Sequence, residues 1–412
     1  MKNKRVLFVA PSSYPIFGAE ANVNAKVVKI LSDAGYMVDV VSRVRKNMEG
    51  VYYPLSKDDV FFGKCSINPI YLNTRKNIKT ILNHLKALLK FGHIYKGIDW
   101  AYYATIRCEE LIKKNHYDLI LTKNEPSEVV GLYISKKYNI KWIPTWNDPY
   151  ISDKYPQPYG KGWNAKVSFS RNRLIKDICK FAPAHIFPSE RLKQYMMRYM
   201  TGIKQERCAV IPHALLKNFQ TVHPKERTEV LKIIHAGELG QERNPETFLQ
   251  GLKEFILQSP NPKIEFTFLG IYLGQKTNCF YDLVEKFELS RYIKVLPPVT
   301  YIESLSVISQ YDVCLIIEAP CDEGIFLPSK VVDYFQCEKR IFSISPKIGT
   351  LNDLYTAELV DYFADVNNPK EIATAINCMY NDFTNNATPK EKDVSFFTEK
   401  NILKSYEDLL LN

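Results

Sequence analysis

The sequence predicts an α/β protein with two domains, each built on a doubly wound parallel sheet. Its length of 412 residues is enough for two domains of ordinary size. Short apolar runs alternate with amphipathic segments of helical period, beginning at Arg5. The alternation stops in the polar, charged stretch 215–228 and restarts at Leu231. We therefore predict one domain over residues 1–220 and a second over 221–396.

The composition indicates a globular protein. Hydrophobic residues make up 46% of the chain and charged residues 24%, which argues against long disordered stretches. No apolar run reaches about 18 residues, the length that a transmembrane helix needs. The apolar run near the amino end is too short for the core of a signal peptide. Nine cysteines without a CxxC pair are typical of free thiols in a reducing cytoplasm and indicate no zinc site.

The net charge of +10 favours acidic partners. Nucleic acid is one candidate class, but the chain has no recognised reader motif. An anionic membrane surface or acidic ligands agree with the charge as well.

Residues 75–95 have the pattern of a basic amphipathic helix. Its apolar stripe and the lysines around it are Ile78, Ile81, Leu82, Leu85, Leu88, Leu89, Lys76, Lys79, Lys86 and Lys90. The stripe could pack against the core, or it could dock on anionic lipid. A second basic cluster could add to such a surface, and it comprises Lys166, Arg171, Arg173, Lys176 and Lys180.

The first half opens with a βαβ unit. We predict a strand over 5–10, a loop over 11–20, a helix over 21–34 and a strand over 37–41. The GxGxxG fingerprint is absent, which disfavours a dinucleotide cofactor. Gly18 in the loop could be an ordinary turn residue.

Polar residues follow two later strands of the first half. Lys123 and Asn124 follow a strand that ends at Thr122, and Asp148 follows a strand that ends at Thr145. Carboxyl ends of parallel strands meet at one edge of a sheet, where Asp148 could orient a sugar hydroxyl. An Asx turn before Pro149 explains the same residue equally well.

The remaining elements continue the alternation. Strands are predicted at 184–188, 209–213, 231–236, 264–270, 293–296, 313–317, 340–344 and 359–363. Helices are predicted at 246–257, 280–287, 302–309, 330–337, 370–380 and 399–411, with one more after Thr350.

The most informative segment is 312–350, which predicts strand, loop, helix and strand. Ser329 is a candidate N-cap for the helix. The helix begins at the carboxyl edge of a parallel sheet, where a phosphate is favoured. Lys330 can add a positive charge to a diphosphate, and Asp333 can accept hydrogen bonds from a ribose diol. Ordinary capping chemistry and a solvated lysine would give the same residues.

The motifs of this segment resemble the donor-binding region of retaining glycosyltransferases of family 4, above all the bacterial surface-polysaccharide branch. The motifs are Glu318-Ala319-Pro320, Pro328-Ser329-Lys330, Asp333-Tyr334 and Lys339-Arg340. Three further segments resemble loops of the same family, namely Gly18-Ala19-Glu20, Trp146-Asn147-Asp148-Pro149-Tyr150, and Gly237 to Pro245 with Arg243 as its cation.

The resemblance implies the GT-B fold, two Rossmann-like domains facing each other across a cleft. It also implies that a C-terminal helix within 397–412 crosses back to the N-terminal domain, which would be the acceptor side. The co-substrate would be a nucleotide-diphosphate sugar, with no cofactor and no metal. The resemblance assigns donor binding to Gly237, Arg243, Pro328, Ser329, Lys330 and Asp333.

The family's pair of glutamates, separated by seven residues, is altered in this chain. Asp333 stands at the second position, and Ile325 stands eight residues before it. Glu318 or Glu323 is therefore expected to contact the donor sugar, and Asp148 is the third catalytic candidate. On the acceptor side the resemblance implies Gly18, Ala19, Glu20, Lys123 and Asn124, the last two standing where many family members have a histidine.

The implied function is transfer of a sugar, with retained anomeric configuration, to a hydroxyl of a lipid-linked glycan in capsule or O-antigen synthesis. The expected location is the cytoplasm, peripheral to the inner face of the plasma membrane, without a nucleic-acid partner. Two alternatives remain. One is a nucleotide-sugar 2-epimerase, which needs further carboxylates and histidines. The other is a catalytically decayed GT-B protein that binds a nucleotide, a sugar or a lipid surface.

Overall fold

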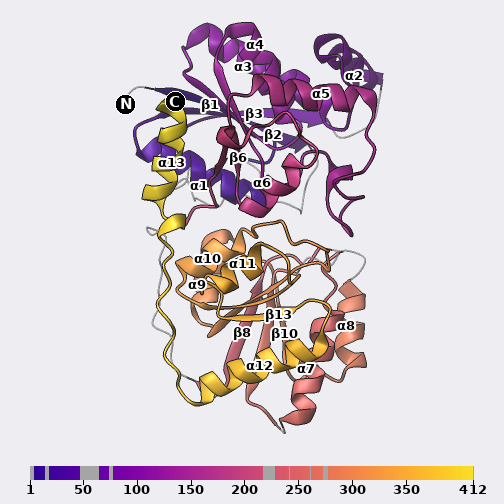
Figure 1. The fold of residues 1–412 in the computed structure, drawn as a ribbon, viewed down its shortest axis with the longest axis vertical. Helices are drawn as coiled ribbons and strands as arrows, with labels where there is room; N and C mark the ends of the chain where they lie inside the picture. Colours follow the sequence, from indigo (N-terminus) through magenta and orange to yellow (C-terminus); the bar gives the residue numbers. More distant parts are fainter. Residues whose placement is uncertain are drawn as a thin grey trace. The chain divides into compact units, whose positions relative to one another are not determined.

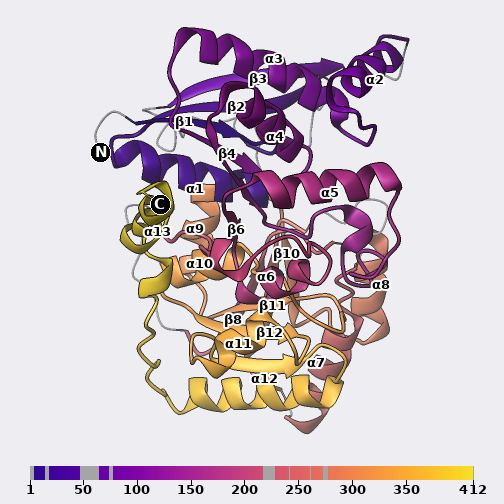
Figure 2. The same ribbon diagram turned by 45° about the horizontal axis from the view of Figure 1, so that its top comes forward.

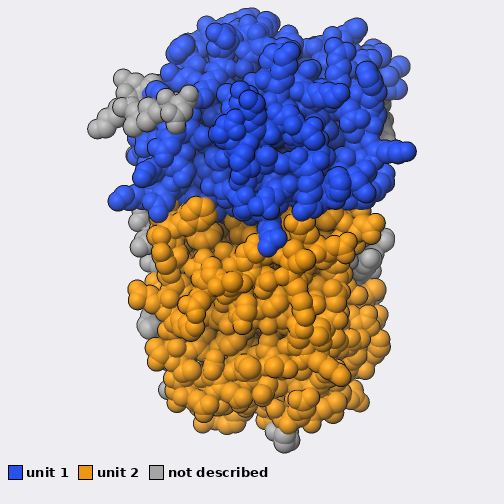
Figure 3. All heavy atoms as spheres, viewed as in Figure 1, with its two compact units in different colours: residues 1–155, 161–214, 399–412 blue, residues 156–160, 215–398 orange. Residues whose placement is uncertain are grey.

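The chain forms two compact units, which Figure 3 colours separately. The computed structural model describes residues 4–13, 18–46, 65–73, 78–216, 228–240, 242–259, 261–271 and 277–411. Unit 1 comprises 1–155, 161–214 and 399–412, and unit 2 comprises 156–160 and 215–398. Most of the linker predicted at 215–228 lies outside the described residues.

Unit 1 is built on a seven-stranded sheet with the order β3-β2-β1-β4-β5-β6-β7, and all its pairings are parallel. The central strands β1 and β4 are apolar and buried, as expected for strands covered on both faces. The strands are β1 (Arg5–Val9), β2 (Met37–Lys46), β3 (Ser66–Asn73), β4 (Leu119–Lys123), β5 (Lys141–Thr145), β6 (His185–Phe187) and β7 (Cys208–Val210).

Helices cover both faces of this sheet, with α1 and α3 on opposite sides (Figure 2). They are α1 (Ala19–Asp33), α2 (Ile78–Phe91), α3 (Ile98–Lys114), α4 (Ser127–Tyr138), α5 (Phe169–Phe181), α6 (Glu190–Met197) and the last helix, α13 (Glu399–Leu411). The Tyr36 hydroxyl donates to Glu407 of α13 at 3.4 Å, and Lys141 donates to the Leu409 carbonyl at 2.7 Å. The predicted return of the C-terminal helix to the first unit is confirmed (Figure 1).

Unit 2 has a six-stranded sheet with the order β10-β9-β8-β11-β12-β13, again parallel throughout. Its strands are β8 (Leu231–Ala236), β9 (Ile264–Leu269), β10 (Ile293–Leu296), β11 (Val313–Ile317), β12 (Arg340–Ser345) and β13 (Tyr362–Asp365). Its helices are α7 (Glu246–Gln258), α8 (Thr277–Lys286), α9 (Tyr301–Ser309), α10 (Lys330–Gln336), α11 (Thr350–Thr356) and α12 (Pro369–Thr384).

Two close contacts through glycine hold helices in place. A Cβ on Gly131 of α4 would lie 2.1 Å from Trp142 Nε1, so only glycine lets α4 pack on this buried indole. The indole N–H donates to Thr122 Oγ1 at 2.9 Å in the neighbouring strand. In unit 2, a Cβ on Gly251 of α7 would lie 2.6 Å from Ile372 of α12.

Each sheet has one switch point, where the strand order reverses. In unit 1 this point lies between β1 and β4, and in unit 2 it lies between β8 and β11. Loops that leave neighbouring strands at such a point run to opposite faces and open a crevice at the carboxyl edge, which is where ligands bind in doubly wound sheets.

The predicted elements of the second half agree with the structure within a few residues. In the first half, α1 begins at Ala19, so Ala19 and Glu20 belong to its first turn and not to the preceding loop. The strand predicted to end at Val41 continues to Lys46. The sequence patterns did not predict β3, α3, α4 or α5. Residues 75–77 of the basic amphipathic segment lie outside the described residues.

Candidate functional site

Polar side chains of unit 2 gather beside the switch point between β8 and β11. Gly237 follows β8, Glu318 follows β11, and Lys330 is the first residue of α10. Gly237 has a φ of +97°, and a Cβ there would lie 3.9 Å from Lys330 Nζ. Arg243, between β8 and α7, places Nη2 3.3 Å from Glu318 Oε1. Three loops therefore bring two cations and a carboxylate to one edge of the sheet.

Lys330 donates to a neutral histidine, with 3.0 Å between its Nζ and His235 Nε2. Burial and the charges of Lys330 and Arg243 hold the pKa of His235 well below its ordinary value. Burial and the Arg243 guanidinium also lower the pKa of Lys330 to about 7. His235 was not predicted as a site residue. Its only sequence signal is a histidine near the carboxyl end of an otherwise apolar strand.

Asp333 and Tyr301 form a second polar pair next to Lys330. The Tyr301 hydroxyl, on the first residue of α9, donates to Asp333 Oδ1 at 2.7 Å. Tyr334 fixes α10 on the sheet, because its hydroxyl accepts from Ala236 N at 3.1 Å and donates to Leu315 O at 3.3 Å. Asp333 is therefore positioned by a neighbouring helix as well as by its own.

The start of α10 departs from the expected capping chemistry. Pro328 is buried, and Ser329 occupies the N-cap position. The Ser329 backbone is nevertheless helical, with φ −59° and ψ −28°, and its side chain accepts no capping hydrogen bond. The helix has only seven residues. The side-chain charges of Lys330 and Arg243, rather than a capped helix end, are the main attraction for an anion here.

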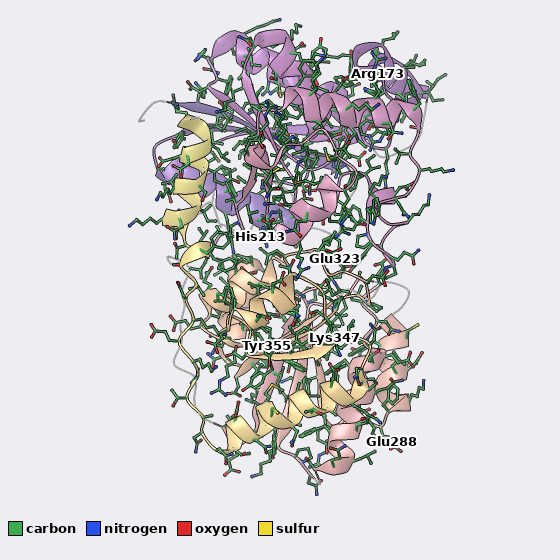
Figure 4. The ribbon with its side chains drawn as sticks, in the orientation of Figure 1. Arg173, His213, Glu288, Glu323, Lys347 and Tyr355 are labelled. Atoms are coloured by element: carbon green, nitrogen blue, oxygen red, sulfur yellow. The ribbon has the colours of Figure 1, made fainter. Side chains whose placement is uncertain are left out.

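The two carboxylates considered for the donor sugar differ in their surroundings. Glu318 is buried and paired with Arg243. Glu323 is half-buried, further along the same loop (Figure 4). The backbone of this loop packs closely against Gly349 at Gly324. A Cβ on Gly349 would lie 2.7 Å from the Gly324 carbonyl oxygen, so the contact requires glycine. The ion pair makes Glu318 the carboxylate that adjoins Arg243.

Tyr159 reaches the same group from a distant segment. Its ring packs edge-on against Phe326, with 5.3 Å between the ring centroids. Burial and the charge of Glu318 raise the pKa of Tyr159, while Arg243 lowers it, so its hydroxyl lies close to both side chains. No sequence pattern pointed to Tyr159, because residues 156–160 are remote in sequence from the other loops of unit 2.

In unit 1, one amide joins two carboxylates at the switch point between β1 and β4. The Asn124 Nδ2 donates to Glu20 Oε1 at 2.9 Å and to Asp148 Oδ2 at 3.4 Å. Its Oδ1 accepts from Asn147 N at 2.8 Å. Lys123, the buried last residue of β4, lies near Glu20. The structure thus brings together four predicted site residues, Glu20, Lys123, Asn124 and Asp148, although more than a hundred positions separate Glu20 from the others.

The protonation of this group is perturbed. Burial and the charge of Asp148 raise the pKa of Glu20 to about 7, while hydrogen bonds from neighbouring side chains oppose the shift. Burial lowers the pKa of Lys123 to about 8, against the attraction of Glu20. Gly18 and Ala19 precede Glu20 as exposed residues, and Gly18 has a φ of +145°. A Cβ added at Gly18 would meet no described atom within 4 Å.

The prediction that Arg171 belongs to a basic surface is wrong. Arg171 is 8% exposed and forms an ion pair with Glu125. Its guanidinium lies 3.9 Å from the centroid of the Tyr95 ring. The buried Glu128 carboxylate accepts from the hydroxyls of Tyr95 at 2.8 Å and Tyr150 at 3.0 Å. This cluster holds the loops after β4 and β5, and of its members only Tyr150 and Arg171 were singled out by the sequence patterns.

The apolar stripe of α2 is exposed, which contradicts the core-facing interpretation of this helix. The exposed fractions are 74% for Ile78, 63% for Ile81, 49% for Leu82, 48% for Leu85, 38% for Leu88 and 88% for Leu89. The opposite side packs on α3, where Asn83 accepts from the Tyr103 hydroxyl at 2.8 Å and Ala87 is fully buried.

Among the described residues, no three or more His, Cys, Asp or Glu side chains are grouped as a metal site would require. None of the helices within the described ranges is long and apolar enough to span a membrane.

Comparison with known proteins agrees with this geometry. Residues 27–215 match the model of glycosyltransferase family 4. No curated protein matches the sequence.

Solved structures match the chain along its whole length. A glycosyltransferase from Rickettsia africae has a TM-score of 0.69 at 14% identity, covering 100% of this chain and 98% of its own. Anabaena HepE in complex with UDP-glucose has a TM-score of 0.67 at 14% identity, covering 99% of both chains. Sucrose-phosphate synthase from Thermosynechococcus elongatus has a TM-score of 0.64 at 14% identity, covering 99% of this chain and 95% of its own. The predicted GT-B architecture of two parallel sheets with flanking helices is confirmed.

Proposed function

We propose that the protein is a retaining glycosyltransferase. It would move a sugar from a nucleotide-diphosphate sugar to a hydroxyl of a lipid-linked glycan in the synthesis of a cell-surface polysaccharide. The observation that carries the proposal is the meeting of Arg243 and Lys330 beside the switch point of unit 2. The match of 27–215 to the family 4 model supports sugar transfer, and a similar structure that holds UDP-glucose supports the class of donor.

On the donor side, Arg243 and Lys330 bind the diphosphate. When the bond between the anomeric carbon and the phosphate oxygen breaks, negative charge develops on the leaving diphosphate, and the two cations stabilise it. Asp333 accepts hydrogen bonds from the ribose, and Glu318 or Glu323 contacts the sugar. The cations take the part that a metal ion plays in other transferases, so we expect neither a metal nor a cofactor to be required.

On the acceptor side, the amide-bridged group of unit 1 binds the acceptor glycan. Asp148 orients the attacking hydroxyl, and Glu20, Lys123 and Asn124 supply the other polar contacts. The hydroxyl attacks the face that the diphosphate leaves, and its proton passes to the leaving phosphate. This route retains the anomeric configuration without a covalent intermediate on the protein.

The exposed stripe of α2 supports docking on an anionic bilayer at the inner face of the plasma membrane. The helix has three lysines and no acidic residue. The exposed Arg173, Lys176 and Lys180 of α5 extend the positive charge, and His93 after α2 contacts Ser170 of α5 at 2.8 Å. Apolar side chains that enter the headgroup region and lysines that meet anionic lipids are the usual components of interfacial binding.

The experiment is to incubate the protein with UDP-, GDP-, ADP- and dTDP-sugars and to measure release of the nucleotide diphosphate. Slow release from one donor in water, accelerated by a glycan acceptor, is expected. Binding without release from any donor would instead indicate a nucleotide-sugar-binding protein without activity. Failure to bind any nucleotide sugar would contradict the proposal.

A further inference from the structure

The two cations of the unit 2 site have unlike partners. Arg243 pairs with the Glu318 carboxylate, whereas Lys330 donates to the uncharged imidazole of His235. Among the described residues, no carboxylate lies within ion-pairing distance of Lys330. A neutral acceptor fixes the direction of the Lys330 amine but adds no negative charge beside it, so no ion pair stabilises the ammonium form before an anion binds.

We propose that His235 is the positioning residue for Lys330, and that Lys330 takes up one proton from solvent when a nucleotide diphosphate binds beside it. The amine becomes an ammonium, and the proton comes from the buffer. This inference rests on the proposed donor site, and it adds to that site a residue and a proton.

The groups around Lys330 explain why the proton is only loosely held before the ligand arrives. Burial and Arg243 disfavour the charged form, and they outweigh the attraction of Glu318, Asp333 and Glu238, so the pKa of Lys330 falls to about 7. His235 does not compete for the proton, because burial and both neighbouring cations keep it neutral. A diphosphate with about two negative charges reverses the balance and raises the pKa of Lys330.

Linkage then fixes the dependence of donor affinity on pH. Below about pH 7 Lys330 is already charged, so it contributes no pH dependence to the affinity for the donor. Above about pH 7 each bound ligand must also recruit a proton, so affinity falls about tenfold per pH unit until the pKa of the complex is reached.

The test is calorimetric titration with the tightest-binding nucleotide sugar in buffers of different ionisation enthalpy. A nucleotide sugar is used because its diphosphate lacks the terminal phosphate group that titrates near pH 6 in a free diphosphate. The slope of the observed enthalpy against the buffer enthalpy gives the protons taken up. We expect a value near zero at pH 6 and between about half and one proton at pH 8.

Variants distinguish the contribution of Lys330 to proton uptake from that of His235. Lys330→Arg keeps a charge that does not titrate, so proton uptake should vanish at both pH values while binding persists. His235→Gln retains an acceptor and should preserve the wild-type uptake. His235→Phe removes the acceptor, which weakens the charged form in the free protein and should produce uptake already at pH 6. His185→Gln changes an equally buried imidazole in unit 1 and is the matched control.

A second measurement needs no ligand. The ¹³Cε resonance of Lys330, assigned by its loss in Lys330→Arg, should titrate near neutral pH in the free protein. Titration above pH 10, or binding at pH 8 without proton exchange, would overturn the inference and leave the donor site intact. Uptake that persists in Lys330→Arg would also overturn it. If no nucleotide sugar binds, the proposed function fails, whatever the resonance shows.

Discussion

Glu20 and Asp148 accept hydrogen bonds from one amide nitrogen, that of Asn124, at 2.9 and 3.4 Å. Two carboxylates held by one amide repel each other when both are charged, and burial adds to the cost of charging them. The site therefore carries a carboxyl group that changes its charge near neutral pH, since the pKa of Glu20 is about 7.

This shift should be visible in stability. The pKa of Glu20 is higher in the folded than in the unfolded protein, so the folded state binds more protons between about pH 4.5 and 7, and stability falls as pH rises through this window. Glu20→Gln removes the effect. Denaturant titrations at several pH values measure the free energy of unfolding of both proteins. The value for the variant minus the value for the wild type should rise by on the order of 1–3 kcal/mol from pH 5 to pH 8. Glu110→Gln, at an exposed position, is the control. A stability difference between Glu20→Gln and the wild type that does not vary with pH would contradict a raised pKa of Glu20.

Removal of either cation should weaken donor binding. Arg243→Ala and Lys330→Ala each lose a charge-assisted contact to the diphosphate, so the Kd for the nucleotide sugar should rise about 10- to 100-fold. Lys253→Ala removes an ion pair with Glu288, which lies at the far end of unit 2 (Figure 4), and should leave the Kd unchanged. Unaltered binding in Lys330→Ala would refute the assignment of the diphosphate.

The hydrogen bond from Tyr301 to Asp333 should sharpen recognition of the ribose. Tyr301→Phe leaves the ring but frees the carboxylate to rotate, so the preference for a ribonucleotide over its 2′-deoxy analogue should fall about three- to tenfold. Calorimetry with both nucleotides measures the ratio. If the variant weakens both nucleotides equally, Tyr301 supports the fold of the site and not its selectivity.

Arg171 and Arg173 provide a matched pair on one helix. Arg171→Leu removes the partner of the half-buried Glu125, which should destabilise unit 1 by about 1–3 kcal/mol. Arg173→Leu, at an exposed position two residues on (Figure 4), should change stability by no more than about 0.5 kcal/mol. Thermal unfolding measures both, and nucleotide binding to unit 2 should survive in each. Equal stability of the two variants would show that the ion pair between Arg171 and Glu125 contributes little.

The stripe on α2 should govern binding to lipid vesicles. Leu85→Glu combined with Leu89→Glu places charge on the exposed apolar face and should abolish sedimentation with vesicles that contain anionic lipid. Leu257→Glu alters a residue of unit 2 that is 73% exposed and should have no effect. Equal sedimentation of all three proteins would exclude α2 as the docking surface.

Much of the architecture was predictable, because strands buried on both faces are continuous apolar runs that can be read locally. The strands β8, β9, β11 and β12 follow this rule. By contrast, α3 was not predicted, although its buried residues include Trp100 and Ala104, because tyrosines and charged residues between them obscure the helical period. The stripe of α2 shows the opposite failure, since amphipathic spacing states which residues share a face and not what that face contacts.

The candidate site divides in the same way. Lys330, Asp333 and Arg243 stand in short motifs, and the structure places them near one another. His235, Tyr301 and Tyr159 were not predicted, because their positions depend on strands and loops that meet only in the folded sheet. Arg171 was placed on a basic surface because it stands among other basic residues of the sequence, such as Lys166 and Arg173. The cleft between the two units stays a prediction.

The placement of α13 affects the order in which the chain can fold during synthesis. Unit 1 contains residues 399–412, which leave the ribosome after all of unit 2. Domains generally fold as they emerge, amino-terminal first. Here the amino-terminal unit cannot complete its packing against Glu407 and Leu409 until α13 has been synthesised, so the later unit can reach its native state before the earlier one.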